Sequence, residues 1–150
     1  MSVKRTASVV DTWGSAPDER EAAYPCDALF DSSDVLFRAV DVDASSALVF
    51  RWLCQLRRAP YGYDWIDNLG RRSPRQLIDG LDRQKVGQRF MIFRLVSFEE
   101  GASITLDSTR GLFGRVVGTY KVVPVEADRS RLVVKLIFSA PPGPYGWVMR

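Results

Sequence analysis

The strongest constraint in this sequence is a series of strand-like segments that occupies the chain from Lys85 onward. Each segment is short and rich in apolar and β-branched residues, and a few polar or glycine residues separate it from the next. The segments are residues 89–98, 103–108, 115–125 and 131–139. In the last one, Leu132, Val134, Leu136 and Phe138 alternate with a mixed set, as in an antiparallel sheet covered on one side. The short connections predict a meander.

A strand and an amphipathic helix precede this meander. Residues 35–42 predict the strand, and after it one helix face follows the i, i+3, i+4, i+7 spacing with Val49, Trp52, Leu53 and Leu56. Asp43 is expected to cap the start of this helix, and Pro60 to end it near Arg58. The same spacing places Arg51, Gln55 and Arg58 on the opposite, polar face. A second short helix is predicted over 65–69, so the chain is read as a single α+β domain.

The first 34 residues differ from the rest in being polar, with scattered Asp, Ser and Pro. We interpret 1–34 as an N-terminal arm lying across a domain formed by 35–150. A short helix is expected near 18–23, and Trp13 and Tyr24 are expected to hold the arm in place.

The absence of histidine excludes several function classes. Ser-His-Asp and Cys-His catalysis need an imidazole, and so do His-ligated haem, zinc and non-haem iron sites. No metal and no cofactor are therefore expected. The two cysteines, without an export signal, are interpreted as free thiols of a cytoplasmic protein. Cys54 is expected in the core, and Cys26 is expected to be the more exposed and more reactive thiol.

The charge pattern gives no reason to expect nucleic acid as a partner. The net charge is only +3, and an acidic front faces a basic middle, an arrangement that the fold can neutralise internally. No segment is long and apolar enough to predict a membrane span.

Three stretches of the sequence carry a family resemblance. They are Trp13-Gly14 with Asp18-Glu19-Arg20, residues 49–69 with the words Phe50-Arg51-Trp52-Leu53 and Tyr61-Gly62-Tyr63-Asp64-Trp65, and Val86-Gly87-Gln88-Arg89. With this order of elements, the chain resembles the SRPBCC superfamily, which includes START-like and polyketide cyclase-like proteins. The resemblance implies a helix-grip fold, in which a curved antiparallel sheet, with two short helices after the first strand, holds a hydrophobic small molecule.

The resemblance also implies a long C-terminal helix across the open sheet. Pro141-Pro142-Gly143-Pro144 stands where that helix would begin, so the helix is expected to be shortened or absent. An uncovered apolar face would then need another cover, and a homodimer is one way to supply it.

The candidate ligand-binding residues are mostly aromatic: Trp52, Tyr61, Tyr63, Trp65, Arg94, Tyr120 and Phe138. Tyr61, Tyr63 and Trp65 would line the mouth of a cavity or pack a tight turn. Arg94 would anchor a carboxylate if it pointed inward, but both parities of its strand are apolar, so its face stays open. Gly118 beside Tyr120 marks a bend or a close approach. Asp107 is expected to face solvent, and Gly111–Gly114 to form a hairpin connection rather than a phosphate loop.

These observations favour non-enzymatic binding or carriage of a hydrophobic small molecule. Two alternatives remain. One is a cyclase- or aromatase-like enzyme, which would need Tyr63, Tyr120, Arg94 or Asp107 to converge on one ligand. The other is a protein-interaction or regulatory domain that docks through the uncovered sheet. No catalytic residue is assigned.

Overall fold

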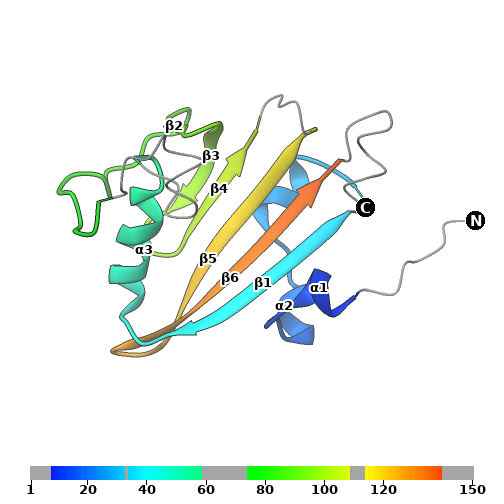
Figure 1. Ribbon diagram of the computed structural model, residues 1–150, viewed down its shortest axis with the longest axis horizontal. Helices are drawn as coiled ribbons and strands as arrows, with labels where there is room; N and C mark the ends of the chain where they lie inside the picture. Colours follow the sequence, from blue (N-terminus) through cyan, green and yellow to red (C-terminus); the bar gives the residue numbers. More distant parts are fainter. Residues whose placement is uncertain (1–7, 33, 59–73, 109–113, 140–150) are drawn as a thin grey trace, which may run out of the picture.

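The computed structural model describes residues 8–32, 34–58, 74–108 and 114–139 (Figure 1). In chain order the elements are α1 (Val9–Thr12), α2 (Pro17–Glu21), the 3-10 turn η1 (Pro25–Ala28), β1 (Val35–Val42), α3 (Ser46–Gln55), β2 (Arg89–Phe90), β3 (Phe93–Glu99), β4 (Ser103–Asp107), β5 (Val116–Glu126) and β6 (Arg129–Phe138). The predicted second helix over 65–69 lies outside the described residues, as do residues 140–150.

The strands form one antiparallel sheet in the order β1-β6-β5-β4-β3-β2. The four segments after Lys85 are consecutive neighbours, which confirms the predicted meander, and β1 pairs with β6 over its whole length. One predicted strand is wrong. The segment 89–98 is broken into β2 and β3 because Met91 adopts a positive φ of 57°, and the chain turns back so that Phe90 pairs with Phe93.

Helix α3 begins and packs differently from the prediction. Its N-cap is Ser45, whose hydroxyl accepts the Leu48 N–H, whereas the expected cap Asp43 instead contacts Arg129 at 3.6 Å. Gln55, placed on the polar face by its spacing, is fully buried. Its side-chain amide donates to the Gln76 carbonyl and accepts from the Ile78 N–H, so it ties the following loop to the helix.

The buried face of α3 consists of Val49, Phe50, Leu53 and Cys54, which pack on Phe90, Leu95, Ile104, Leu106 and Val122 of the sheet. Trp52 is half-buried and does not belong to this cluster. The predicted face is therefore right for Val49 and Leu53, and Leu56 packs at its margin. Compared with the predicted face, the helix turns Phe50 and Cys54 toward the sheet, and these two residues occupy the core in place of Trp52.

The N-terminal arm packs on the opposite face of the sheet. Tyr24 and Cys26 form a second buried cluster with Phe37, Ala39, Val117, Val133 and Ile137. Tyr24 anchors the arm as expected, since it is only 5 % exposed. The Trp13 side chain is exposed, and what Trp13 contributes is its carbonyl, which accepts the Ala39 N–H at the edge of β1. In Figure 1, α1 and α2 lie beside β1.

Ion pairs with side chains of β6 hold the arm to the sheet. Arg131 of β6 makes a two-pronged contact with Glu19, and also contacts Asp41 at 3.0 Å and the Gly14 carbonyl at 2.7 Å. Lys135 contacts Asp27 at 2.5 Å. Carboxylates of the acidic front thus pair with the last strand, and in the described residues none of them forms an ion pair with the basic middle of the sequence.

The arm reverses the expected burial of β6. Val133 and Ile137, on the mixed face, are 2 % and 3 % exposed because the arm covers them. Leu132, Val134, Leu136 and Phe138, on the wholly apolar face, are only half-buried. The face that composition marks as the core side is therefore the more open one.

Candidate functional site

The pairing register aligns side chains in rows across the α3 side of the sheet. One row holds Arg38, Val134, Tyr120 and Ile104, from β1, β6, β5 and β4. The neighbouring row holds Leu36, Leu136, Gly118 and Leu106 in the same strand order. Ile104 and Leu106 are buried beneath α3, and burial falls toward β1. The site lies where the cover given by α3 ends.

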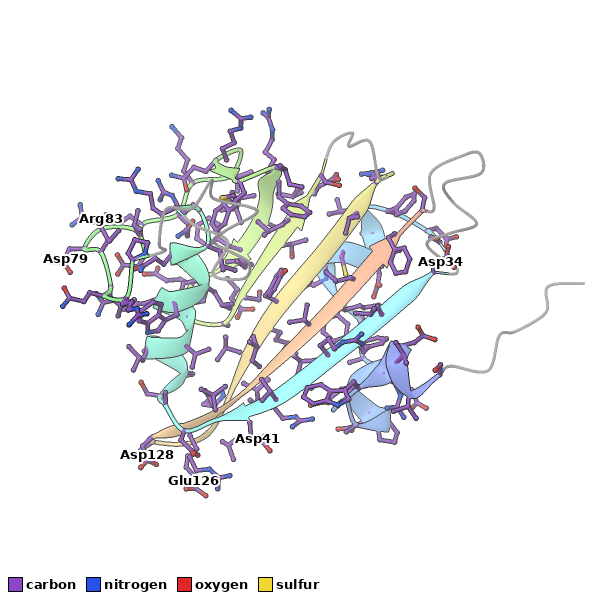
Figure 2. All side chains as sticks on the ribbon, viewed as in Figure 1. Asp34, Asp41, Asp79, Arg83, Glu126 and Asp128 are labelled. Atoms are coloured by element: carbon purple, nitrogen blue, oxygen red, sulfur yellow. The ribbon has the colours of Figure 1, made fainter. Side chains whose placement is uncertain are left out.

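The residues at this boundary form a surface that we call the open strip. It consists of the half-buried apolar side chains Leu36, Val116, Val134, Leu136 and Phe138. None of the five belongs to either buried cluster of the described residues. The labelled charges in Figure 2 lie at the ends of the sheet or beyond α3, away from the middle of the strands.

Tyr120 stands between the open strip and the α3 core. Its ring packs against the α3 cluster, and burial raises the pKa of its phenol. The phenol is therefore neutral near physiological pH and can both donate and accept a hydrogen bond. Within the described residues its hydroxyl has no hydrogen-bond partner. On this half-buried residue, a hydroxyl without a protein partner is a position where a ligand atom could form a hydrogen bond.

Gly118 explains the shape of the surface next to Tyr120. A Cβ atom at this position would lie 2.4 Å from Cδ2 of Leu136, so the missing side chain lets Leu136 lean across β5. Of the two predicted roles, close approach is the one that the structure supports, and the group that approaches is part of the protein itself. Leu136 can move, since the contact involves the end of a flexible side chain.

Arg94 points away from this site. It lies opposite Asp107 and Arg89 in the register, on the face that carries the arm, and it is exposed. The β-bulge between Leu95 and Ser97 leaves Leu95 and Phe98 toward α3. Strand parity left open whether Arg94 points inward or outward, and in the structure it points outward.

Asp107 is buried, and the expectation that it faces solvent is wrong. It is 6 % exposed and accepts two hydrogen bonds from Arg115, at 3.2 Å and 2.7 Å, which raise the pKa of that guanidinium. Arg115 also lies over the Phe30 ring, 5.1 Å from its centroid. Since Asp107 and Arg94 lie on the face opposite Tyr120, these three candidates for an enzyme site do not converge.

Neither cysteine offers a reactive thiol. Cys54 is a core residue as predicted, and desolvation raises its pKa to about 11. The expectation of an exposed Cys26 is wrong, because this thiol is fully buried between the arm and the sheet, and desolvation raises its pKa too. Both thiols are therefore protonated near neutral pH.

The remaining sequence candidates divide into two groups. Trp52 and Phe138 are half-buried, Phe138 in the open strip and Trp52 on α3. Tyr61, Tyr63 and Trp65 lie outside the described residues, as do residues 111–113 of the glycine-flanked connection. No group of three metal-ligating side chains occurs in the described part of the chain.

Arg38 is a residue of this face that the sequence reasoning missed. It lies in β1 between Leu36 and Val40, and the register places it beside Val134. A signal for it existed, because strand alternation in 35–42 puts residues 36, 38 and 40 on one face. Arg38 is thus a charged member of an apolar row.

Comparison with known proteins supports the fold. No protein-family model matches the sequence, and no curated protein does either. Among solved structures, a START superfamily protein from Mycobacterium smegmatis aligns with a TM-score of 0.50 and 21 % identity, over 76 % of this chain and 83 % of that chain. A Thermobifida fusca protein solved by NMR aligns with a TM-score of 0.50 and 15 % identity, over 77 % of this chain and 79 % of that chain. The di-domain aromatase/cyclase BexL aligns with a TM-score of 0.49 and 18 % identity, over 77 % of this chain and 40 % of that chain.

The two alignments with a TM-score of 0.50 and the six-stranded sheet place the chain in the helix-grip class of α+β folds. Within that class the fold is START-like, which confirms the fold predicted from the sequence. None of the helices in the described ranges has the length and apolar character that crossing a bilayer requires.

Proposed function

We propose that this protein binds a hydrophobic small molecule on the α3 side of its sheet, against the open strip and Tyr120, and that it does so without catalysing a reaction. The observation that carries the proposal is the half-buried apolar surface beside a phenol that has no hydrogen-bond partner in the part of the chain that the structure describes. Ligand sites typically combine a mostly apolar lining with a few polar groups that orient the ligand. The START-like fold is consistent with this use.

The chemistry of the strip favours binding over catalysis. A general base must lie within hydrogen-bond reach of the proton that it removes. None of the open-strip residues is titratable, and Asp107 is on the opposite face, paired with Arg115. Tyr120 holds its proton because burial raises its pKa. We therefore assign Tyr120 the role of orienting a ligand.

The first experiment is native mass spectrometry of freshly purified protein. A single chain carrying a co-purified small molecule is the expected result. A second copy of the chain is the competing cover for the open strip, and a stable dimer without bound small molecule would support that cover instead.

A titration with N-phenyl-1-naphthylamine, a neutral apolar fluorophore, tests the location. Val134→Gln changes the open strip, and Val125→Gln is its matched control, since Val125 is 54 % exposed elsewhere on β5. Removing the apolar contact of Val134 should weaken binding about tenfold, and the control should leave it unchanged. Equal affinity in both variants, with unchanged circular dichroism, would place the ligand elsewhere.

A further inference from the structure

The outer edge of the sheet, at β2 and β3, carries a group of basic side chains. Lys85, Arg89 and Arg94 are all exposed. Across the described ranges, none of the three contacts a carboxylate. Residues 84–98 contain these three basic residues and no acidic residue, so the segment carries +3, which equals the net charge of the whole chain. The remaining residues therefore sum to zero, and this short segment accounts for the excess positive charge of the protein.

Two of these cations form a like-charged pair. Arg89 and Arg94 lie directly opposite each other where β2 pairs with β3. The Cβ atoms of such a pair are about 5 Å apart, and like charges at this spacing repel each other. The next residue in the row, Asp107, already accepts two hydrogen bonds from Arg115. An anion from outside the protein would therefore relieve the repulsion between the two guanidinium groups.

Exposed apolar side chains lie among these cations. Ile92, in the turn between β2 and β3, is 75 % exposed, and Val86, just before β2, is 59 % exposed. The segment around Val86 runs beside β3, since the Gly87 N–H donates to the Leu95 carbonyl at 2.7 Å. β2 is the last strand in the sheet order, and the buried cluster under the arm does not extend to it. We call this surface the basic edge; it consists of Lys85, Val86, Arg89, Ile92 and Arg94.

The other end of the sheet carries the opposite charge. The hairpin that joins β5 and β6 has more carboxylates than arginines around it: Asp41, Asp43, Glu126 and Asp128 against Arg129 and Arg131. Figure 2 shows the labelled acidic residues Asp41, Glu126 and Asp128 at this end, and Figure 1 shows β2 far from it. A molecule polarised in this way turns its basic edge toward a negatively charged surface.

From this combination of cations and exposed apolar side chains, we propose that the protein docks peripherally on a bilayer that contains anionic lipid, with the basic edge against the headgroups. The cations pair with headgroup phosphates, and Ile92 and Val86 enter the boundary between headgroups and acyl chains. A nucleic-acid backbone offers phosphates but no apolar layer for these two side chains, so a lipid surface accounts for more of the basic edge. This inference goes beyond the proposed function and depends on residues outside the open strip.

Co-sedimentation of the full chain with lipid vesicles tests the inference. One kind of vesicle is phosphatidylcholine alone, and in the other about a third of the lipid is phosphatidylglycerol, which is anionic. The wild type should sediment with the anionic vesicles and bind the neutral vesicles several-fold more weakly. High salt should release the protein from the anionic vesicles, because salt screens exposed charges.

Two matched pairs of variants locate the contact. Arg94→Gln should weaken binding to the anionic vesicles about fivefold, which is the contribution of one cation near such a surface. Arg129→Gln makes the same charge change at the other end of the sheet and should leave binding unchanged. Ile92→Gln should weaken binding several-fold because it removes an apolar contact with the bilayer, whereas Val125→Gln, at a site that is 54 % exposed near the end of β5, should not. All four sites are exposed, and circular dichroism verifies that each variant is folded.

The outcomes separate this inference from the proposed function. Equal binding to both kinds of vesicle, no binding to either, or the same loss in Arg94→Gln and Arg129→Gln overturns the inference. Binding to a double-stranded DNA oligonucleotide that Arg94→Gln weakens and Ile92→Gln does not, together with no vesicle binding, assigns the basic edge to nucleic acid instead. Each of these results leaves the proposed function standing, because the neutral fluorophore tests it separately at Val134.

Discussion

The contact between Glu19 and Arg131 predicts how strongly the arm is held to the sheet. Glu19 accepts from two nitrogens of Arg131, and both side chains are largely buried, at 15 % and 23 % exposed. Asp41 contacts the same guanidinium once, at 3.0 Å, with a side chain that is 60 % exposed. Glu19→Gln and Asp41→Asn therefore remove one negative charge each from the same arginine, in different surroundings.

The expected losses follow from those surroundings. Hydrogen bonds to charged groups contribute about 1.5–3 kcal/mol each, and the glutamine oxygen retains part of the interaction, so Glu19→Gln should lower the free energy of unfolding by about 2 kcal/mol. An exposed single contact contributes roughly 0.5 kcal/mol, which is the loss expected for Asp41→Asn. Urea unfolding followed by far-UV circular dichroism measures both.

The difference between wild type and Glu19→Gln should also depend on pH. The hydrogen bond from Arg131 lowers the pKa of Glu19 from its ordinary value of 4.5. A group whose pKa is lowered in the folded state contributes its full stabilisation above its unfolded pKa, and loses it as pH falls through its folded pKa. The two proteins should therefore differ fully near neutral pH and converge in acid below 4.5.

Two results would refute this reasoning. Equal losses in Glu19→Gln and Asp41→Asn would mean that burial and two-pronged geometry add nothing to the Glu19 contact. A Glu19→Gln deficit that persists unchanged in strong acid would mean that the loss has a cause other than the carboxylate charge.

Three other predictions test the packing. Gly14→Ala should destabilise the protein by several kcal/mol, because Gly14 has a φ of +73° and a Cβ there would lie 2.0 Å from the Ala39 carbonyl oxygen. Gly80 also has a positive φ, of +80°, but a Cβ there would meet open space. Gly80→Ala should therefore lower the free energy of unfolding by only about 1 kcal/mol in the same urea assay. Leu53→Ala should cost about 2–4 kcal/mol and the exposed Leu48→Ala less than about 0.5, and equal effects would contradict the burial of α3. Both thiols should resist Ellman's reagent in the native protein and react on unfolding, because both are buried with raised pKa values; fast native labelling of either would show that its cover opens.

Much of the fold could be predicted from the sequence because its signals are local. Runs of apolar and β-branched residues identified β1 at its observed bounds and located β4, β5 and β6 to within a few residues. The 3.6-residue spacing located α3. The break between β2 and β3 could not be predicted in this way, since a positive φ at Met91 carries no mark in the residue type.

The candidate site could be predicted only in part. Strand parity put Tyr120 and Phe138 on the apolar sides of their strands, and the structure places both on the α3 side of the sheet; their role in binding stays a prediction. Arg94 could not be placed, since both parities of its segment are apolar. The alternation of residues 35–42 puts Leu36 and Arg38 on one face, but which face the arm leaves open could not be read from it.

The amino-acid sequence by itself determined where β1, β4, β5, β6 and α3 lie and which side chains of these strands share a face, because side-chain period is a property of the local backbone. Only the tertiary structure decided which face is covered. The arm buries the mixed face of β6 by placing Tyr24 and Cys26 on Val133 and Ile137, more than a hundred residues further along the chain. Such burial depends on contacts between distant segments, and no local pattern records them.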